Sequence, residues 1–223
     1  MKKRAFIFGS YNTATEGWTL TSWKLSPPVL KSQYIDKPGG DGSWDLSTAL
    51  TDGLPRYSER TLTATFELST GDRASREQAI RKMFKQVNGQ RLNLVTPDDT
   101  DYYITGRVSV VKEYSDLAHA AVTVTAICDP WKLAFAEKTH TLTAKTEQQT
   151  VNLGNSGGRA EVPTIVVQGI GVIVKLSHND TSISLTPGTY KWPELVLMPS
   201  KITRLGYSGS GEITITYAEA VLE

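Results

Sequence analysis

Polar and apolar residues alternate along most of this chain. In residues 61–68 and 121–127 the side chain changes character at almost every position, and such alternation places one set of side chains on each face of an extended strand. Runs of the same kind occur at residues 5–8, 18–25, 91–95, 102–111, 140–142, 164–167, 172–176, 182–185 and 212–217. Turn-forming clusters separate them, as in residues 37–42 and 208–211. About ten short strands predict sandwiches or barrels of β-sheet.

One segment, residues 75–88, has the periodicity of a helix instead. Its apolar residues recur at spacings of three and four: Ala79, Ile80, Met83, Phe84 and Val87. Ser75 with Gln78 has the form of a capping box, and Gly89 suits a left-handed C-cap. We therefore predict one α-helix that rests its apolar stripe on a sheet. Its basic positions are predicted to face solvent: Arg76, Arg81, Lys82 and Lys85.

A domain boundary is predicted after the segment Cys128-Asp129-Pro130-Trp131. The sequence then becomes polar and glycine-rich, and strand-like sequence resumes at Val162. We therefore expect a first domain over residues 1–133, a polar linker with the first strand of the second domain over 134–160, and the remainder of a C-terminal β-sandwich over 161–223. No repeat of fixed period is present in the sequence, which disfavours solenoids and propellers.

Charge and composition exclude several classes of protein. Lysine and arginine number 24 and the acidic residues 23, for a net charge of +1 over 223 residues, so no overall field attracts nucleic acid or an anionic membrane. The apolar stretch after the basic N-terminus ends at Phe8, which is too short for a signal peptide. Residues 162–174 are too short and too interrupted to span a bilayer. We expect a soluble protein made in a cytoplasm.

The segment Gly154-Asn155-Ser156-Gly157-Gly158 fits the G-x-S-x-G pattern of a hydrolase nucleophile. In hydrolases this pattern forms a sharp turn, the nucleophile elbow, with a strand before the serine and a helix after it. Here strand-like sequence follows instead, and the histidine that comes later, His178, lies in a predicted hairpin turn. We interpret the segment as a flexible loop between strands, and a hydrolase is the alternative that Ser156 would support.

Metal and thiol chemistry are also disfavoured. The histidines lie far apart and in no metal-binding spacing: His119, His140 and His178. The acidic turn after Pro97 lacks the glycine and distal glutamate of a calcium loop: Asp98, Asp99 and Asp101. Cys128 is the single cysteine, and we expect a half-buried structural thiol with no basic neighbour to lower its pKa. We predict no catalytic, cofactor-binding or metal-binding residue and no cofactor.

Five tryptophans leave a second function open: Trp18, Trp23, Trp44, Trp131 and Trp192. Flat aromatic rings match the apolar faces of pyranosides, although aromatic residues on strands more often anchor a core or an interface. A host-surface carbohydrate-binding adhesin module is therefore the alternative function. Binding of glycans by residues 134–223 would favour it.

Read in order, the motifs resemble the distal tail proteins (Dit) of siphophages. The most distinctive is Pro-Gly-x-Asp-Gly-x-x-Asp-Leu at residues 38–46. Before and after it come Phe8-Gly9, Trp18, residues 20–28, Ala49-Leu50-Thr51, Tyr57 and Glu59-Arg60-Thr61-Leu62. The predicted helix, Tyr102-Tyr103, Gly106-Arg107 and residues 128–131 continue the likeness. The C-terminal half is similar to the family's second domain through residues 151–155, 163–165, 192–195 and 213–217, and it departs from that pattern at residues 198–201.

The resemblance implies a mainly β protein, with an N-terminal β-sandwich or split-barrel ring domain that carries one α-helix and a smaller, galectin-like C-terminal β-sandwich. It also implies a structural, non-enzymatic hub of a phage tail tip or baseplate. Members of the family form homohexameric rings, often paired back to back in crystals. The ring connects the tail tube to the tail-associated lysin or hub protein and lets DNA pass. Some members carry receptor-binding proteins. The implied location is the virion tail tip, after synthesis in the host bacterial cytoplasm.

The resemblance places the ring contacts on the first domain. Gly39, Asp41, Gly42 and Asp45 are candidate interface residues that shape a turn, and Arg60 is expected to be available to a carboxylate. The alternative is that these residues only stabilise their own turn. A closed ring uses one heterologous contact repeatedly, and near-zero net charge suits a channel that must not retain duplex DNA.

Overall fold

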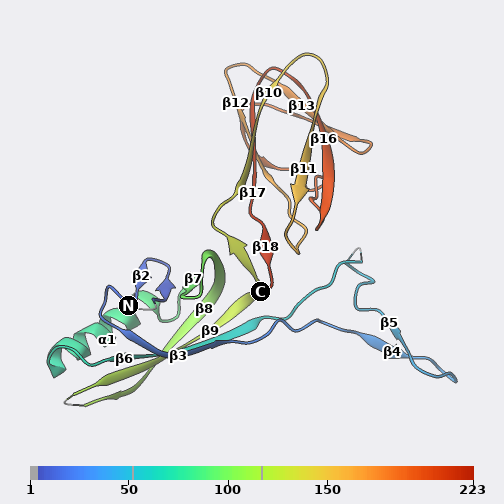
Figure 1. Ribbon diagram of the computed structural model, residues 1–223. Helices are drawn as coiled ribbons and strands as arrows, with labels where there is room; N and C mark the ends of the chain where they lie inside the picture. Colours follow the sequence, from blue (N-terminus) through green and yellow to red (C-terminus); the bar gives the residue numbers. More distant parts are fainter. Residues whose placement is uncertain (1–4, 52, 117) are drawn as a thin grey trace. The chain divides into compact units, whose positions relative to one another are not determined.

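The structure is a computed structural model that describes residues 5–51, 53–116 and 118–223 (Figure 1). The chain divides into two compact units, Met1–Lys132 and Leu133–Glu223. Both units are built from antiparallel strands, and the described residues form a single α-helix, α1. The predicted fold class is therefore confirmed.

A large sheet organises the first unit, with strand order β2-β1-β7-β8-β9-β6-β3. These strands span Tyr11–Asn12 (β2), Ile7–Phe8 (β1), Arg91–Thr96 (β7), Asp99–Ser115 (β8), Ala120–Ala134 (β9), Arg60–Leu68 (β6) and Thr19–Leu25 (β3). Alternation decides its two faces: along β6 the even-numbered residues are buried, and the odd-numbered Thr61 and Thr63 are exposed. Ala134, the last residue of β9, belongs to the second unit and donates its N–H to Glu219, next to β18 (Ala220–Val221).

Helix α1 spans Arg73–Val87 and begins earlier than the sequence predicted. Its N-cap is Asp72, whose carboxylate accepts a hydrogen bond from the Ser75 N–H at 2.8 Å, so the prediction of Ser75 as the cap was wrong. The aspartate three residues upstream captures that donor because its side-chain oxygen already faces the first helical turn. At the other end, Gly89 follows the helix with φ of 75°, as a C-cap glycine requires.

Arg76 corrects a second expectation about the helix. It was predicted on the solvent face, but it is buried. Its guanidinium donates hydrogen bonds to the carbonyl oxygens of Gly71, at 2.5 Å, and Asp116, at 3.2 Å. A buried cation is tolerated when it is hydrogen-bonded, and the two carbonyl oxygens that accept from Arg76 link the start of α1 to the β8–β9 connection. The other three predicted basic positions are exposed.

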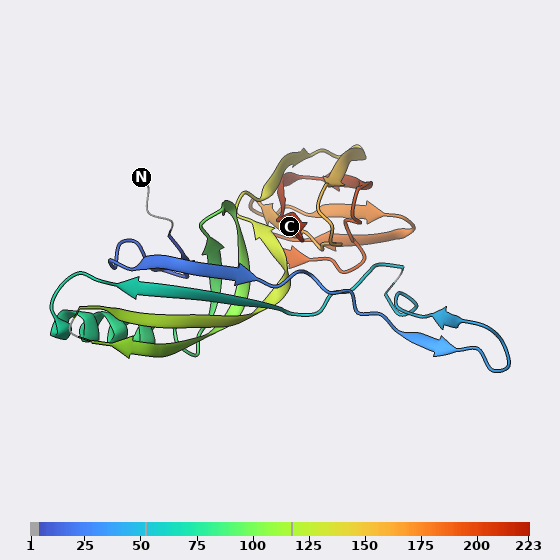
Figure 2. The same cartoon turned by 60° about the horizontal axis from the view of Figure 1, so that its bottom comes forward.

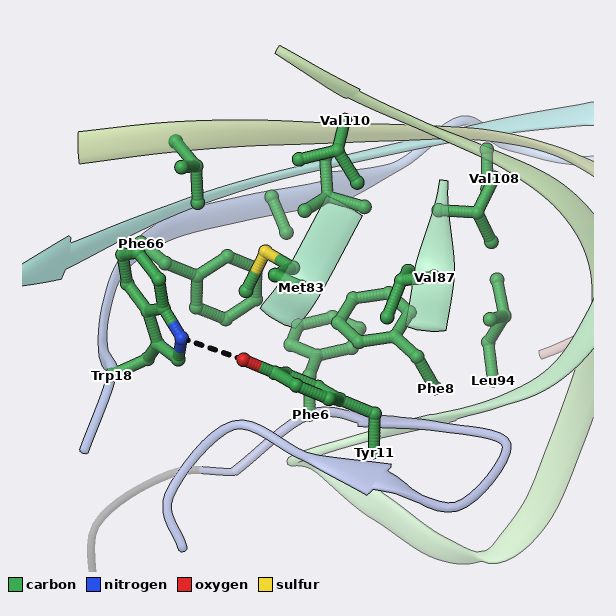
Figure 3. Close-up of a cluster of buried hydrophobic side chains, with 14 of the residues drawn as sticks. Phe6, Phe8, Tyr11, Trp18, Phe66, Met83, Val87, Leu94, Val108 and Val110 are labelled. Carbon is green, nitrogen blue, oxygen red and sulfur yellow. Dashed lines mark hydrogen bonds between the residues drawn. The ribbon is translucent and has the colours of Figure 1, made fainter. Parts of the chain in front are cut away.

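Aromatic rings fill the core between α1 and the large sheet (Figure 3). Phe6 packs edge-on against Phe66, with ring centroids 5.8 Å apart, and Phe8 stacks on Phe6. Trp18 is buried and donates its indole N–H to the Tyr11 hydroxyl at 2.8 Å, the bond dashed in Figure 3. Burial raises the pKa of Tyr11 to about 12, because its ionised form would lose hydration. The N-terminal strands β1 and β2 have only two residues each, and side-chain packing in this core helps to hold them in place.

Cys128 lies in this core and is more deeply buried than predicted, with 1% of its surface exposed. Burial raises the pKa of the Cys128 thiol to about 12. The expectation of no basic neighbour was wrong, since Arg60 lies directly opposite in the β6–β9 register and acts to lower that pKa. Burial outweighs this charge because it removes the thiolate from water.

The thiol is therefore expected to be inert in the folded protein. Treatment with iodoacetamide at pH 8 should leave Cys128 unmodified, because both access and thiolate are lacking. The same treatment in denaturant should add one carbamidomethyl group, detected by mass spectrometry. Equal rates of modification in the two conditions would contradict the burial of this side chain.

The second unit is a sandwich of two four-stranded sheets (Figure 2). One sheet has the order β10-β17-β12-β15, formed by Lys138–Ala144, Gly211–Tyr217, Thr164–Gln168 and Gly188–Lys191. The other has the order β11-β16-β13-β14, formed by Gln149–Asn155, Lys201–Gly209, Val174–His178 and Thr181–Leu185. One buried cluster draws Ile165 and Ile215 from the first sheet and Leu153 and Leu205 from the second, so the core lies between the sheets.

Candidate self-assembly surface

The surroundings of Ser156 do not form a hydrolase site. No helix follows Ser156, and the chain bends toward Glu161 instead. Lys138 donates to the Ser156 Oγ at 3.0 Å and forms an ion pair with Glu219 at 2.6 Å. The hydrogen bond to Glu219 raises the pKa of Lys138, so the ammonium stays charged and cannot remove the serine proton. The contacts instead join β10 to the loop after β11.

The other candidate ligands are dispersed. Within the described ranges, no three His, Cys, Asp or Glu side chains gather closely enough to hold a metal ion. His140 stacks on Tyr217, while His178 contacts the Arg204 carbonyl oxygen. The acidic segment lies at the predicted β7–β8 hairpin, where Asp99 pairs with Lys132 at 2.9 Å. In the described part of the chain, no helix is long and apolar enough to cross a membrane.

The tryptophans do not form a common surface for a sugar. Trp18 and Trp192 are buried in the two separate cores. Trp23 packs against the first core, and Trp131 meets the edge of Tyr57 at 5.5 Å. Only Trp44 among the five is exposed. The observation that suggested a carbohydrate site in the second unit is therefore accounted for by core packing.

Trp44 belongs to a separate two-stranded hairpin of the first unit, which we call the arm (residues 29–51 and 53–58). Its strands are β4, Tyr34–Asp36, and β5, Ser43–Asp45 (Figures 1 and 2). At its base, Lys31 donates to the Arg56 carbonyl at 2.8 Å and Ser58 donates to the Val29 carbonyl at 2.9 Å. All six strand residues are exposed. The described part of the arm therefore holds together by backbone pairing and local side-chain hydrogen bonds, and none of its strand residues is buried.

The hairpin register gives the arm two different faces. Ile35 pairs with Trp44, which makes an apolar face. Tyr34 pairs with Asp45 and Asp36 pairs with Ser43, which makes an acidic and aromatic face. Hydrogen bonds from Ser47 hold the pKa of Asp45 below its usual range, so this carboxylate is ionised at neutral pH. Of the described residues, none forms an ion pair with Asp36 or Asp45.

Four of the predicted interface residues lie on this arm. Gly39 and Gly42 adopt φ of 70° and 75° in the β4–β5 turn, a conformation that disfavours other residues. The Lys37 N–H donates to the Gly42 carbonyl oxygen across that turn. Asp41 lies exposed at the tip, and Asp45 accepts a hydrogen bond from the Ser47 N–H at 2.9 Å. These local contacts agree with a turn-forming role, and a role in an interface stays a prediction.

Arg60 is placed differently from the other four. It begins β6, and only 3% of its surface is exposed. Its Nε donates to the Ser26 carbonyl oxygen at 2.7 Å, and Ser26 also exchanges hydrogen bonds with Thr61. The side chain thus anchors the two chains that lead into the arm. We therefore keep the predicted subunit contact for the arm residues and give Arg60 a supporting role at the base.

Sequence reasoning missed the apolar surface that the arm exposes. Exposed large apolar side chains occur on both strands and on the segments that flank them: Val29, Leu30, Tyr34, Ile35, Trp44, Leu46 and Leu50. A monomeric protein rarely leaves such a group of side chains in water, and their clustering indicates a contact with a partner. Pro38 and the glycines signalled the turn, but exposure on both faces of a hairpin leaves no periodic signal.

A comparison with known proteins finds a likeness in fold. No protein-family model matches the chain, and a search of curated proteins finds no match. Among solved structures, the chain is similar to the Dit protein (gp 19.1) of phage SPP1, with a TM-score of 0.67 and 15% identity over 97% of this chain and 98% of that one. That protein is described as a paradigm of the hub adsorption apparatus in phages that infect Gram-positive bacteria. The predicted resemblance to distal tail proteins is confirmed for the fold.

Proposed function

We propose that this chain is a structural hub protein of a phage tail tip that works by assembling into a closed ring. The likeness in fold to SPP1 Dit supports the class of protein. The observation that carries the ring is the arm, because its large apolar side chains are exposed and its carboxylates form no ion pair with any described residue. An extended element of this kind gains its cover from a neighbouring copy.

The ring is proposed to have six copies and to join the tail tube to a tail-associated lysin or hub protein. A heterologous contact repeated around a closed ring leaves no arm uncovered. The second unit, an independent sandwich with its own core, is available for receptor-binding proteins. The net charge of +1 supports a channel through which DNA passes, because 23 acidic side chains nearly balance the 24 lysines and arginines and leave little excess positive charge to hold phosphates. Such a protein is expected at the virion tail tip and needs no catalytic group.

Solution mass and imaging test this proposal. Native mass spectrometry of the purified chain should give six times the 24.5 kDa protomer mass, or twelve times that mass for paired rings. Negative-stain images should show rings with a central hole. Labelled protein should also bind one end of isolated tails. A protein that stays monomeric at high concentration and binds no tail end would overturn the proposal.

A further inference from the structure

A head-to-tail ring needs an acceptor surface as well as an arm. Both must lie on the same protomer, at different places, because each copy donates its arm to one neighbour and receives an arm from the other. The arm offers an acidic and aromatic face, so its acceptor should combine an apolar floor with a cation. The need for such an acceptor rests on the proposed function, a closed ring of copies of this chain.

A groove of about 620 Å³ in the first unit has this character. It lies where β8 and β9 meet the chain that follows α1, and its lining includes Val108, Ile127 and Arg107. Ile127 is apolar and half-exposed, on the face of β9 opposite the core. The Arg107 guanidinium is held in place by donating to the Gly89 carbonyl oxygen at 2.8 Å.

Two arginines of this groove repel each other within the protomer. Arg91 and Arg107 lie directly opposite each other in the β7–β8 register, and like charges in such a pair repel. Asp129 neutralises Arg91, with contacts of 2.6 and 2.8 Å. Among the described residues, no acidic side chain forms an ion pair with Arg107. This includes Glu59, which lines the same groove. Within the described chain, Arg107 therefore has no carboxylate partner, whereas the arm carries two carboxylates, Asp36 and Asp45, without a cationic partner.

We propose that this groove receives the arm of the neighbouring copy, with Arg107 bound to the carboxylates of the acidic face, Asp36 and Asp45. Tyr34 of the same face then covers Ile127, and Ile35 and Trp44, on the opposite face of the arm, make a second contact in the ring outside this groove. A guanidinium suits this position because it binds carboxylates through two parallel hydrogen bonds and also stacks on aromatic rings. The contact neutralises an arginine and two aspartates that have no ionic partners within one protomer.

The outer surface of α1 is the competing acceptor. Its hollow of about 580 Å³ is lined by Arg73 and Arg81, which would also attract the aspartates. Its other lining residues are Ala74, Glu77 and Gln78, and Glu77 is already paired with Lys112 at 2.6 Å. No large apolar side chain lines that hollow, so Tyr34 would stay in water. The Arg107 groove satisfies both requirements, and the hollow satisfies one.

Two charge-reversed variants test the pairing when they are mixed. The arm variant carries Asp36→Lys and Asp45→Lys, and the groove variant carries Arg107→Glu. Either variant alone brings like charges together at every contact and should form no ring. In an equal mixture, the lysines meet the new glutamate and the native aspartates meet Arg107. The mixture should therefore form rings in which the two variants alternate, seen by native mass spectrometry with one variant isotopically labelled.

The controls separate the acceptor from the function. Arg81→Glu, on the competing hollow, should leave ring formation unchanged, and its loss of rings would overturn the assignment to Arg107. Rings from either variant alone, or a mixture without rings while the native protein forms them, would also overturn it and leave the proposed function standing. If the native protein itself forms no ring under any condition, the proposed function fails and this inference fails with it.

A cross-link tests the same contact without charge reversal. The double variant Ser43→Cys, Ser109→Cys places one exposed thiol on the acidic face of the arm and one in the groove. A short bis-maleimide should join these copies into a covalent ladder up to the size of the ring. Each single variant should give no ladder, because Cys128 is buried. Rings of the double variant that yield no ladder would contradict the proposed seat of the arm.

Discussion

Replacing Ile35 and Trp44 together with serine is expected to abolish the ring and leave the protomer folded. Both side chains lie on the apolar face of the arm, and 46% and 51% of their surfaces are exposed in one protomer. Truncation of a tryptophan anchor commonly costs about 2 kcal/mol or more at an interface, which is about a 30-fold weaker contact. Because every contact of the ring carries the same defect, we expect monomers by native mass spectrometry at concentrations where the native protein forms rings.

The melting temperature of the monomeric variant should match that of dissociated native protein, since these side chains fill no core. A matched control is Ile202→Ser, which removes an exposed apolar side chain from the second unit. That variant should still form rings. A double arm variant that assembles normally would contradict the role of the arm, and one that unfolds would contradict its structural independence.

Phe66→Ala is expected to produce the largest loss of stability, confined to the first unit. The Phe66 ring is completely buried and meets the edges of both Phe6 and Phe8, at centroid distances of 5.8 and 6.0 Å. Removing a buried phenyl group costs about 3–5 kcal/mol, from lost burial and from the cavity left behind. The second unit has a separate core, so its unfolding transition should stay at the native temperature.

Calorimetry, or denaturant unfolding with unit-specific probes, would measure the unfolding transition of each unit separately. Phe135→Ala makes the same chemical change where 53% of the side chain is exposed, in the second unit, and should have a much smaller effect. If Phe66→Ala lowers both unfolding transitions equally, the two cores are not the separate cooperative units that the packing indicates. If it lowers neither, the packing of Phe66 described above is wrong.

Alternation in the sequence predicted strands well where one face is buried and the other is in water. Strand β6 is the clearest example, because burial changes at each residue. The same signal missed β16, whose buried positions include the polar Thr203 beside Leu205 and Tyr207 of the second core. A strand with only two apolar residues among its buried positions gives a weak periodic signal.

Local chemistry was predicted less well wherever distant residues supply the partners. The cap of α1 moved to Asp72, and Arg76 turned inward to carbonyls more than one helical turn away or on another loop. Arg107 appeared in the sequence only within the Gly106-Arg107 match to the family, with no contact assigned to it. Its significance comes from the register that sets it opposite Arg91 and from the placement of Asp129, neither of which is local in sequence.

The sequence by itself determined that this is a mainly β chain with one helix, a turn at residues 37–42 and no recognisable catalytic motif, because these follow from periodicity, glycine placement and residue spacing. The tertiary structure alone decided that the strands of the hairpin around that turn are exposed, and that Arg107, which forms no ion pair with any described residue, lines a groove elsewhere in the same unit. Exposure and pairing are properties of packed elements, and a packed arrangement depends on contacts between residues far apart in the chain.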